Sequence, residues 1–441
     1  MKGRILQVTS LLVFAAVSQA QNGSNITAEV DAVFPQSETL YLYIHQHPEL
    51  SLHEQRTATK LAAGLRELGY EVSTGIGNTG VVGVLKNGSG PVVMLRTELD
   101  ALPVEEKTGL SYASTTRTKD DSGKEVGVAH ACGHDVHMAA WMATARIMAN
   151  ARSRWRGTLV MLGQPAEELA EGAHAMLADG LFTRFPRPDY ALAVHDDARY
   201  AAGIIGYHSG PILTNADIVN ITIYGQGGHG ARPETTIDPI VIAARTVLAL
   251  QTIVSRETSP FDPAVITVGS IHGGTRPNII PDQVKLELTV RSFTEPVRQH
   301  LLSAIDRIAK AEAAAAGAPR EPLVEHLAAA ANALVNDPEL TLRVSTALLR
   351  ELGPTQVQDL PPEMASEDFA EFQRAGVPTL MLRIGAVEQV KYDAAVKSGA
   401  ALPSLHSPFF APDRGPTIKA AVVAEVVALR ELMPAPTVNR P

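Results

Sequence analysis

Cysteine is nearly absent from this sequence, since Cys132 is the one cysteine among 441 residues. A single cysteine cannot form an intrachain disulfide, so the fold does without that crosslink and the thiol is free for other chemistry. The chain also lacks a basic excess, with 38 Lys and Arg against 47 Asp and Glu and a net charge of −9. No basic stripe is present, which argues against a nucleic acid as partner.

Long apolar runs are also lacking. The run from Leu11 to Val17 is too short to span a bilayer, and we expect no membrane span elsewhere in the chain. Lys2 and Arg4 precede this run, and Ser18-Gln19-Ala20 follows it with small residues, which is the pattern of a signal peptide over residues 1–20. The sequence therefore predicts an exported protein that is periplasmic or secreted after cleavage.

The stretch from Val128 to Ala145 brings the cysteine together with three histidines and is predicted to begin a helix with Asp135 at its N-cap. In this stretch Cys132 and His134 are two residues apart. A thiolate and an imidazole at the start of a helix can converge on one soft or borderline metal ion. The alternative is a buried free cysteine beside histidines in ordinary hydrogen bonds, and this stretch alone does not decide between the two.

Three apolar segments typical of buried strands each end in acids or histidine. They are Val92–Leu95, followed by Glu98 and Asp100, Thr158–Leu162, followed by Glu167 and Glu168, and Tyr190–Val194, followed by His195. Helices are expected between them, which predicts an open, mostly parallel α/β sheet whose ligands lie beyond the carboxyl ends of the strands. Acids on solvated loops would explain one such strand end well and three of them poorly.

The length of the chain favours two domains. From Asp217 onward the pattern changes to strand, helix, strand, strand and helix, which makes a second compact unit of about 110 residues. The final segment is most simply the rest of the first sheet, so the second unit is predicted to be an insertion. We place the catalytic domain at residues 28–212 and 323–441 and the inserted domain at residues 213–322.

Eight motifs in order resemble the aminoacylase/carboxypeptidase family of dinuclear metallohydrolases, and the likeness is closest to its branch of hippurate hydrolase and the indole-acetyl-amino-acid amidohydrolases. The motifs are RTELDALP, HACGHDVH, GQPAEE, AVHDD, GQGGHGARP, GGTRPNIIPD, SEDFAEF and LHSPFF. The resemblance covers nearly the whole chain after the predicted signal peptide. The resemblance implies an α/β catalytic domain and an inserted, ferredoxin-like α+β lid domain, with a homodimer formed through the lid.

The resemblance also implies roles for single residues. Two divalent metal ions would be bound by Cys132, His134, Glu168, His195 and His406. Glu167 matches the general base, and His229 matches a lid histidine that reaches the substrate carbonyl, often from the partner subunit. Asn278 and Arg291 match the lid residues that bind the free carboxylate of the substrate. A thiolate favours zinc on softness alone, whereas this branch also uses manganese, so both metals stay open.

The function implied is hydrolysis of an N-acyl amino acid by metal-activated water, with a carboxylate accepting the proton. An alternative is an exported metallo-carboxypeptidase or dipeptidase acting on short peptides, in which Asp196 and Asp197 would receive the free amine. A binding protein without catalysis is disfavoured by the intact ligand set and base.

Two departures from the branch stand out. Glu98 replaces the more usual aspartate, and the loop after His195 lacks the usual aromatic and proline residues.

Overall fold

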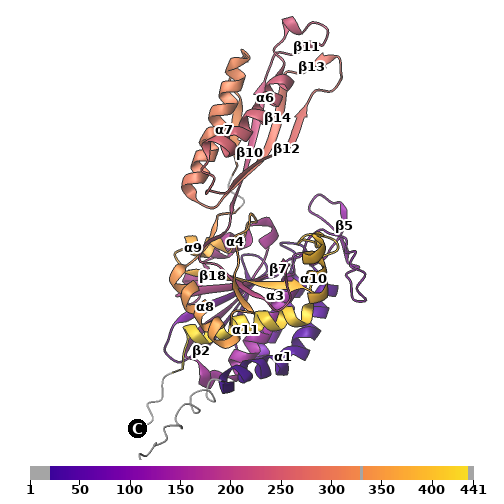
Figure 1. The fold of residues 1–441 in the computed structure, drawn as a ribbon. Helices are drawn as coiled ribbons and strands as arrows, with labels where there is room; N and C mark the ends of the chain where they lie inside the picture. The colour runs from indigo at the N-terminus through magenta and orange to yellow at the C-terminus, as the bar shows by residue number, and fades with distance from the viewer. Residues whose placement is uncertain (1–19, 328–330, 436–441) are drawn as a thin grey trace, which may run out of the picture.

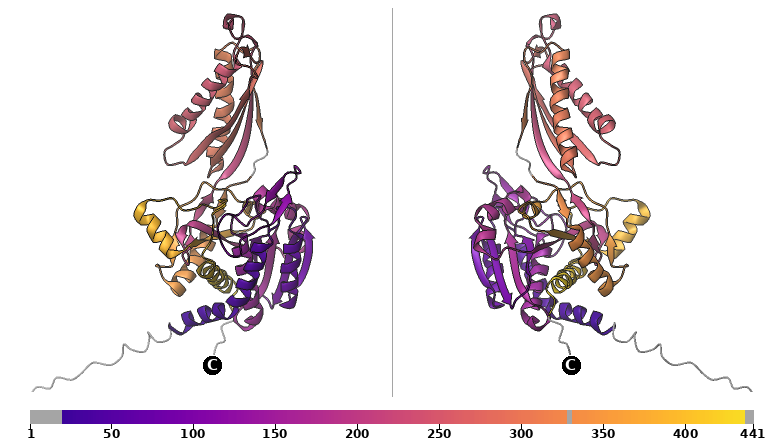
Figure 2. Two further views of the ribbon diagram at one scale, coloured as in Figure 1. Left: turned by 90° about the vertical axis from the view of Figure 1, so that its right-hand side faces the viewer. Right: turned by 90° about the vertical axis from the view of Figure 1, so that its left-hand side faces the viewer.

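The computed structural model describes residues 20–327 and 331–435. Two bodies are visible in Figures 1 and 2, a larger domain that contains both ends of the described chain and a smaller domain that projects from it. The predicted signal peptide lies outside the described residues except for Ala20, which begins helix α1 (Ala20–Gln46). Export of the protein therefore stays a prediction.

An eight-stranded sheet forms the centre of the larger domain. In spatial order its strands are β1 (Glu71–Ile76), β2 (Gly80–Asn87), β6 (Gly157–Gln164), β3 (Val92–Glu98), β7 (Tyr190–Ala201), β18 (Thr379–Val387), β8 (Ile205–Tyr207) and β17 (Val357–Asp359). The four central strands, from β6 to β18, are mutually parallel, while β1, β2 and β8 pair antiparallel to their inner neighbours. The prediction of an open, mostly parallel α/β sheet is confirmed.

Helices cover both faces of this sheet because its central strands are apolar on both sides. One face packs against α1, α2 (Gln55–Glu67), α3 (His134–Asn150), α8 (Pro338–Leu352) and α11 (Arg414–Leu432). The other face packs against α4 (Gly172–Ala178), α5 (Leu181–Arg184) and α9 (Ala370–Arg374). Short strands β4 (Arg117–Lys119) and β5 (Glu125–Gly127) form a hairpin, and β9 (Gly210–Leu213) pairs with β16 (Leu334–Asn336).

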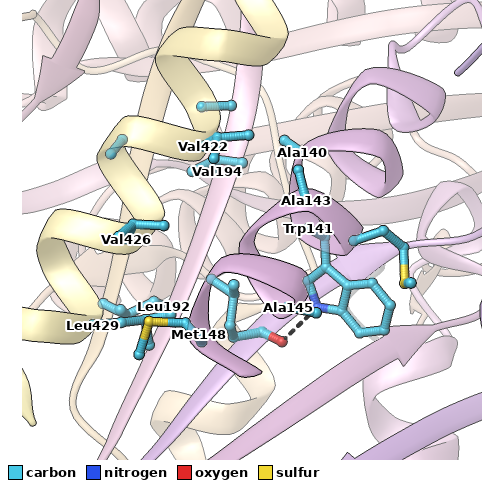
Figure 3. Close-up of a cluster of buried hydrophobic side chains, with 14 of the residues drawn as sticks. Ala140, Trp141, Ala143, Ala145, Met148, Leu192, Val194, Val422, Val426 and Leu429 are labelled. Atoms are coloured by element: carbon cyan, nitrogen blue, oxygen red, sulfur yellow. Dashed lines mark hydrogen bonds between the residues drawn. The ribbon is translucent and has the colours of Figure 1, made fainter. Parts of the chain in front are cut away.

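Helix α3 is buried along nearly its whole length, which fixes the position of the residues at its start. In Figure 3, Met148 of α3 lies toward Leu192 of β7 and Leu429 of α11, whereas the indole of Trp141 projects from the opposite side of α3. The indole Nε1 of Trp141 donates to the backbone oxygen of Leu95, 3.0 Å away, so this large side chain is both packed and hydrogen-bonded. The start of α3 is thus held rigidly against the ends of the central strands.

The smaller domain is an antiparallel sheet with two helices on one face. Its strands, in spatial order, are β12 (Ala264–Gly273), β14 (Gln283–Ser292), β10 (Asn215–Tyr224) and β15 (Leu323–His326), and its helices are α6 (Pro239–Thr252) and α7 (Glu295–Ala315). The alternation along β14, with Val284, Leu286, Leu288 and Val290 buried, turns one face toward the helices. This β-α-β-β-α-β order is the ferredoxin-like arrangement that was predicted.

The boundaries of the smaller domain, called the lid below, remain a prediction. Strand β15 belongs to the lid sheet although it lies beyond the predicted limit at residue 322.

Among the described helices, the stretch Pro239–Glu257 is long and apolar enough to cross a membrane by length and composition, with 33% of it buried. In this structure Ile242, Leu250 and Ile253 of that stretch pack into the core of the lid.

A buried carboxyl group on α11 should make stability depend on pH. Burial raises the pKa of Glu425 to about 8, although Thr144 Oγ1 donates a hydrogen bond to it at 2.5 Å. The folded protein retains this proton after the unfolded chain has lost it, so stability falls as pH rises from about 4.5 through about 8. We expect Glu425→Gln to gain melting temperature relative to wild type between about pH 5 and about pH 9, measured by thermal unfolding. If the melting temperatures of Glu425→Gln and wild type differed by the same amount at both pH values, Glu425 would not be the source of this pH dependence.

Candidate metal centre

The candidate site lies where the four central strands end, as an open α/β sheet predicts. Glu98 is the last residue of β3, and β6 leads into a single 3-10 turn, Glu167–Leu169. His195 lies within β7. His406 comes later, in the loop that follows helix α10 (Gln389–Ser398). Cys132 and His134 come from the other direction, at the start of α3.

The structure brings the five predicted metal ligands together around the sulfur of Cys132. His406 Nε2 lies 3.2 Å from Cys132 Sγ, and His195 Nε2 lies 3.6 Å from the same atom. Glu168 Oε2 is 3.5 Å from His406 Nε2, and Glu168 Oε1 is 3.9 Å from His134 Nε2. Two groups of side chains place possible ligand atoms within 4.8 Å of one another. The first group is Cys132, His134 and Glu168, and the second is Glu98, His134, His137 and His195.

Two buried ligand atoms without hydrogen-bond partners indicate that the cluster around Cys132 fits a metal ion. His134 Nε2 and Glu168 Oε1 are buried, and neither has a hydrogen-bond partner within the described part of the chain. A buried polar atom without a partner costs free energy, and a cation between these atoms would satisfy both. Thiolate, imidazole and carboxylate are the ligands that zinc takes in proteins. The residues present therefore suit a divalent metal.

Neighbouring groups orient the two histidines so that Nε2 faces the cluster. His134 Nδ1 lies 2.8 Å from the backbone oxygen of Asp100, and His195 Nδ1 lies 2.8 Å from that of Asp196. In each case Nδ1–H donates to a carbonyl, which leaves the Nε2 lone pair free for a metal, as is usual for ligating histidines.

Unusual backbone conformations position the ligands. Gly133 has φ 83°, and a side chain there would place its Cβ 2.0 Å from Asp196 Oδ2. Gly133 is also the N-cap of α3, so the prediction of Asp135 as N-cap is wrong; Asp135 lies in the first turn, where it pairs with His45 Nδ1 at 2.6 Å. His406 has φ 66°, a left-handed conformation that is uncommon outside glycine and that concentrates at functional sites.

A second buried layer lies behind the ligands, and sequence reasoning missed the part that His137 takes in it. His137 Nδ1 donates to Glu98 Oε2 at 3.0 Å, and His137 Nε2 accepts from the backbone N–H of Asp196 at 2.8 Å. His137 thus links the end of β3 to the residue that orients His195. The spacing of one helical turn between His134 and His137 was the one available signal, because it places both rings on one face of α3.

Arg96 neutralises the acids beneath this layer. Its side chain is wholly buried and pairs with Glu98, with Glu367 at 2.7 Å and with Asp368 at 3.1 Å. Gln164 bonds to both Arg96 and Asp368, at 3.0 and 2.6 Å. Because Glu367 and Asp368 follow the lid in sequence, Arg96 joins the two halves of the catalytic domain.

The acids of the site are crowded enough to hold protons. Burial and the charge of Glu367 raise the pKa of Glu167 well above its usual range, and burial raises the pKa of Glu168 to about 7. Burial lowers the pKa of His134, but its bond to Asp100 and the charge of Glu98 outweigh this and raise it to about 10. Burial and the charge of Glu168 raise the pKa of the Cys132 thiol. A divalent cation would displace these protons, since ligands bind metals deprotonated.

A cavity of about 1070 Å³ opens over the cluster. Its lining includes Glu167, whose Oε2 lies 3.8 Å from His134 Nε2, and Arg291, whose Nη1 donates to the backbone oxygen of Met364 at 3.0 Å. Glu167 and Arg291 thus both line the cavity, Glu167 beside the ligand residues and Arg291 on the lid side.

The other two predicted lid residues lie far from this cavity. His229 is in β11 (Gly228–His229), which pairs with β13 (Ile279–Ile280), and Asn278 directly precedes β13. Figure 1 shows both strands at the end of the lid that points away from the catalytic domain. Asn278 and Arg291 are separated by the length of β14, which is about 30 Å of extended chain. One chain therefore does not bring His229 and Asn278 to its own cluster.

Comparison with known proteins identifies the family. Residues 94–398 match the peptidase family M20/M25/M40. The chain belongs to this family. It is 36% identical over 348 residues to hippurate hydrolase of Campylobacter jejuni, covering 79% of this chain and 82% of that protein. It is also 36% identical over 331 residues to N-acetyl-L-cysteine deacetylase of Bacillus subtilis, covering 75% and 76% of the two chains.

A solved member of the M20 family supports the same assignment. A dinuclear metal-binding peptidase of Bacillus subtilis superposes with a TM-score of 0.73 and 29% identity, covering 90% of this chain and 98% of that one. The protein described here is thus a hydrolase of a family with dinuclear metal binding, and it carries a matching cluster of ligand residues.

The metal content of this M20 hydrolase should depend on Cys132. Elemental analysis of the pure wild-type protein should find about two divalent ions per chain. Cys132→Ala should lose at least one of them, because its sulfur lies nearest to the other donors. Met138→Leu, a buried change on the same helix, serves as control and should keep both ions. A Cys132→Ala protein with full metal content would exclude the role given to this thiolate.

Proposed function

We propose that this protein is an exported amidohydrolase that cleaves the amide bond of N-acyl amino acids, releasing a carboxylic acid and a free amino acid. The observation that carries the proposal is the placement of Glu167 and Arg291 in one cavity with the metal ligands. Hippurate hydrolase and the deacetylase named above, whose substrates are N-acyl amino acids by name, support the same substrate class.

Cys132, His134, Glu168, His195 and His406 would hold two divalent ions, zinc or manganese. When bound, these ions supply Lewis acidity and lower the pKa of water near them. The Glu167 carboxylate would accept a proton from the attacking water at Oε2 and pass it to the leaving nitrogen. Its raised pKa suits a group that must carry a proton between these two steps. Arg291 would bind the substrate carboxylate, since a guanidinium matches that group in shape and charge.

A peptidase function is the second candidate, because thermostable carboxypeptidase 1 of Saccharolobus solfataricus is 35% identical over 333 residues. A dipeptide would need a free carboxylate to receive its amine. Asp197 is instead held by Arg199 in two hydrogen bonds of 2.9 and 2.7 Å, and Asp196 faces His137. Asp197 is thus already engaged and Asp196 Oδ1 is turned toward His137, which favours acyl amino acids over dipeptides.

The positions of His229 and Asn278 support a homodimer. Each is exposed at the far end of its lid, so a partner chain is needed to bring such a lid end to this cavity. We propose that the two chains associate through their lids and that each supplies His229 to the other. In this arrangement His229 would donate to the substrate carbonyl as negative charge develops on its oxygen.

Glu167→Gln tests the role of the base. The substitution keeps the size of the side chain and removes its basicity, so turnover should fall by roughly 10²-fold or more while metal content is kept. Glu168→Gln, the adjacent control, should lose metal. Hydrolysis of benzoyl- and acetyl-amino acids measures the first effect, and elemental analysis the second. The opposite pattern, with metal lost only from Glu167→Gln, would exchange the two assignments.

Mixed dimers test the exchange of lids. Glu167→Gln and His229→Ala should each be nearly inactive alone, because every site lacks one group. After the two are unfolded and refolded together in equal amounts, half of the dimers are mixed and one site in each is complete. About a quarter of wild-type activity should return. A mixture as inactive as its components would show that His229 does not act across the dimer.

A further inference from the structure

Helix α10 forms an apolar wall of the cavity. Tyr392, Ala395, Val396 and Gly399 follow one another at the spacing of a helical face, and all four line the cavity. No residue of α10 is buried, and 68% of Val396 is exposed. Leu402 and Leu405 continue the same wall along the segment that leads to His406.

Several charged residues of the cavity are paired with one another, although Nη1 of Arg383 has no hydrogen-bond partner within the described part of the chain. Arg199 binds Asp197 and also Glu363, at 2.6 Å. Arg383, beside His195 in the register of β18 and β7, donates to the backbone oxygen of Pro361 at 2.7 Å and lies 3.6 Å from Asp197. A charged substituent would compete with these ion pairs, whereas an apolar group would only displace water from α10.

The position of α10 assigns the wall to one end of the substrate. Arg291, at the base of the lid, would fix the carboxylate end, and the metal ligands would fix the amide. In Figures 1 and 2, α10 lies at the lid-facing end of the catalytic domain, to one side of the strands that enter the lid. The acyl group leaves the amide on the side opposite to the amino acid, and α10 is continuous through residues 399–405 with the ligand His406.

We propose that α10 is the acyl-binding wall of this enzyme and that its preferred substrates carry a bulky apolar acyl group, aromatic or medium-chain alkyl. This inference rests on the proposed hydrolysis of N-acyl amino acids. The cavity of one chain has a volume of about 1070 Å³, at the upper end for small-molecule sites, and the wall along α10 extends beyond the reach of an acetyl group.

A series of N-acyl alanines tests the proposal on the metal-loaded, full-length protein. Each methylene buried against the wall should raise kcat/KM about three- to fourfold, so hexanoyl-alanine should exceed acetyl-alanine by about 10²-fold. Ala395→Trp fills the wall and should reduce that ratio to less than about fivefold. The matched control is Ala394→Trp, on the exposed side of the same helix and outside the cavity, which should keep the wild-type ratio.

A binding measurement separates the wall from the chemistry. Free hexanoate should bind more tightly than acetate to wild type and to Ala394→Trp, and this advantage should be lost in Ala395→Trp. A wild-type kcat/KM that does not change with acyl length would overturn the proposal. So would an Ala395→Trp protein that changes preference among amino acids and not among acyl groups. If hexanoate binds at α10 but no acyl amino acid is cleaved, the wall is supported and the proposed function fails.

Discussion

The buried charge of Arg96 is the interaction on which the arrangement of the site depends. A guanidinium without access to water is tolerated only where acids surround it, and Glu98, Glu367 and Asp368 do so here. Removing it would leave three buried carboxylates without a counter-charge, at a cost of about 3–5 kcal/mol. Because these acids come from both sides of the lid insertion, the same contact closes the catalytic domain and supports the floor of the metal centre.

Charge alternates in layers from this floor to the cavity. Above Arg96 lies Glu98, then His137, and then Asp196, whose backbone oxygen orients the ligand His195. Each layer fixes the position of the next through a hydrogen bond between buried groups, which is how second-layer residues hold metal ligands in place. Burial and the negative charge of neighbouring acids raise the pKa values of Glu167, Glu168 and the Cys132 thiol at the top of the site.

Much of this site could be predicted from the sequence, because its parts are local patterns. An apolar run followed by acids predicts a buried strand and its carboxyl end, and parallel strands bring such ends together. The family motifs, which include these strand ends, pointed to Cys132 and to the four residues that the structure gathers near it. Sequence reasoning failed where the role depends on partners far away in sequence. His137 could be a helix-face histidine by its spacing, and only its contacts with Glu98 and Asp196 show otherwise.

Two further features were not predictable from local pattern. Helix α10 buries none of its residues, so its sequence has no strong core-facing periodicity. Its proposed role follows only from the cavity that it lines. The distance of His229 and Asn278 from the cluster depends on the length and direction of the lid strands, which motif order does not specify. Glu98, one methylene longer than the usual aspartate, is accommodated by reaching both Arg96 and His137.

The order of the ligands along the chain has a consequence for biosynthesis. Cys132 and His406 are 274 residues apart, and nearly the whole chain must be made before the cluster can close. A nascent chain thus has only a partial ligand set, with weaker affinity for any metal it meets. Contacts of such long sequence separation also form late in folding. If the cluster binds metal as proposed, the full ligand set becomes available only where the last helices fold, and the metal supply at that place would govern which ion is bound.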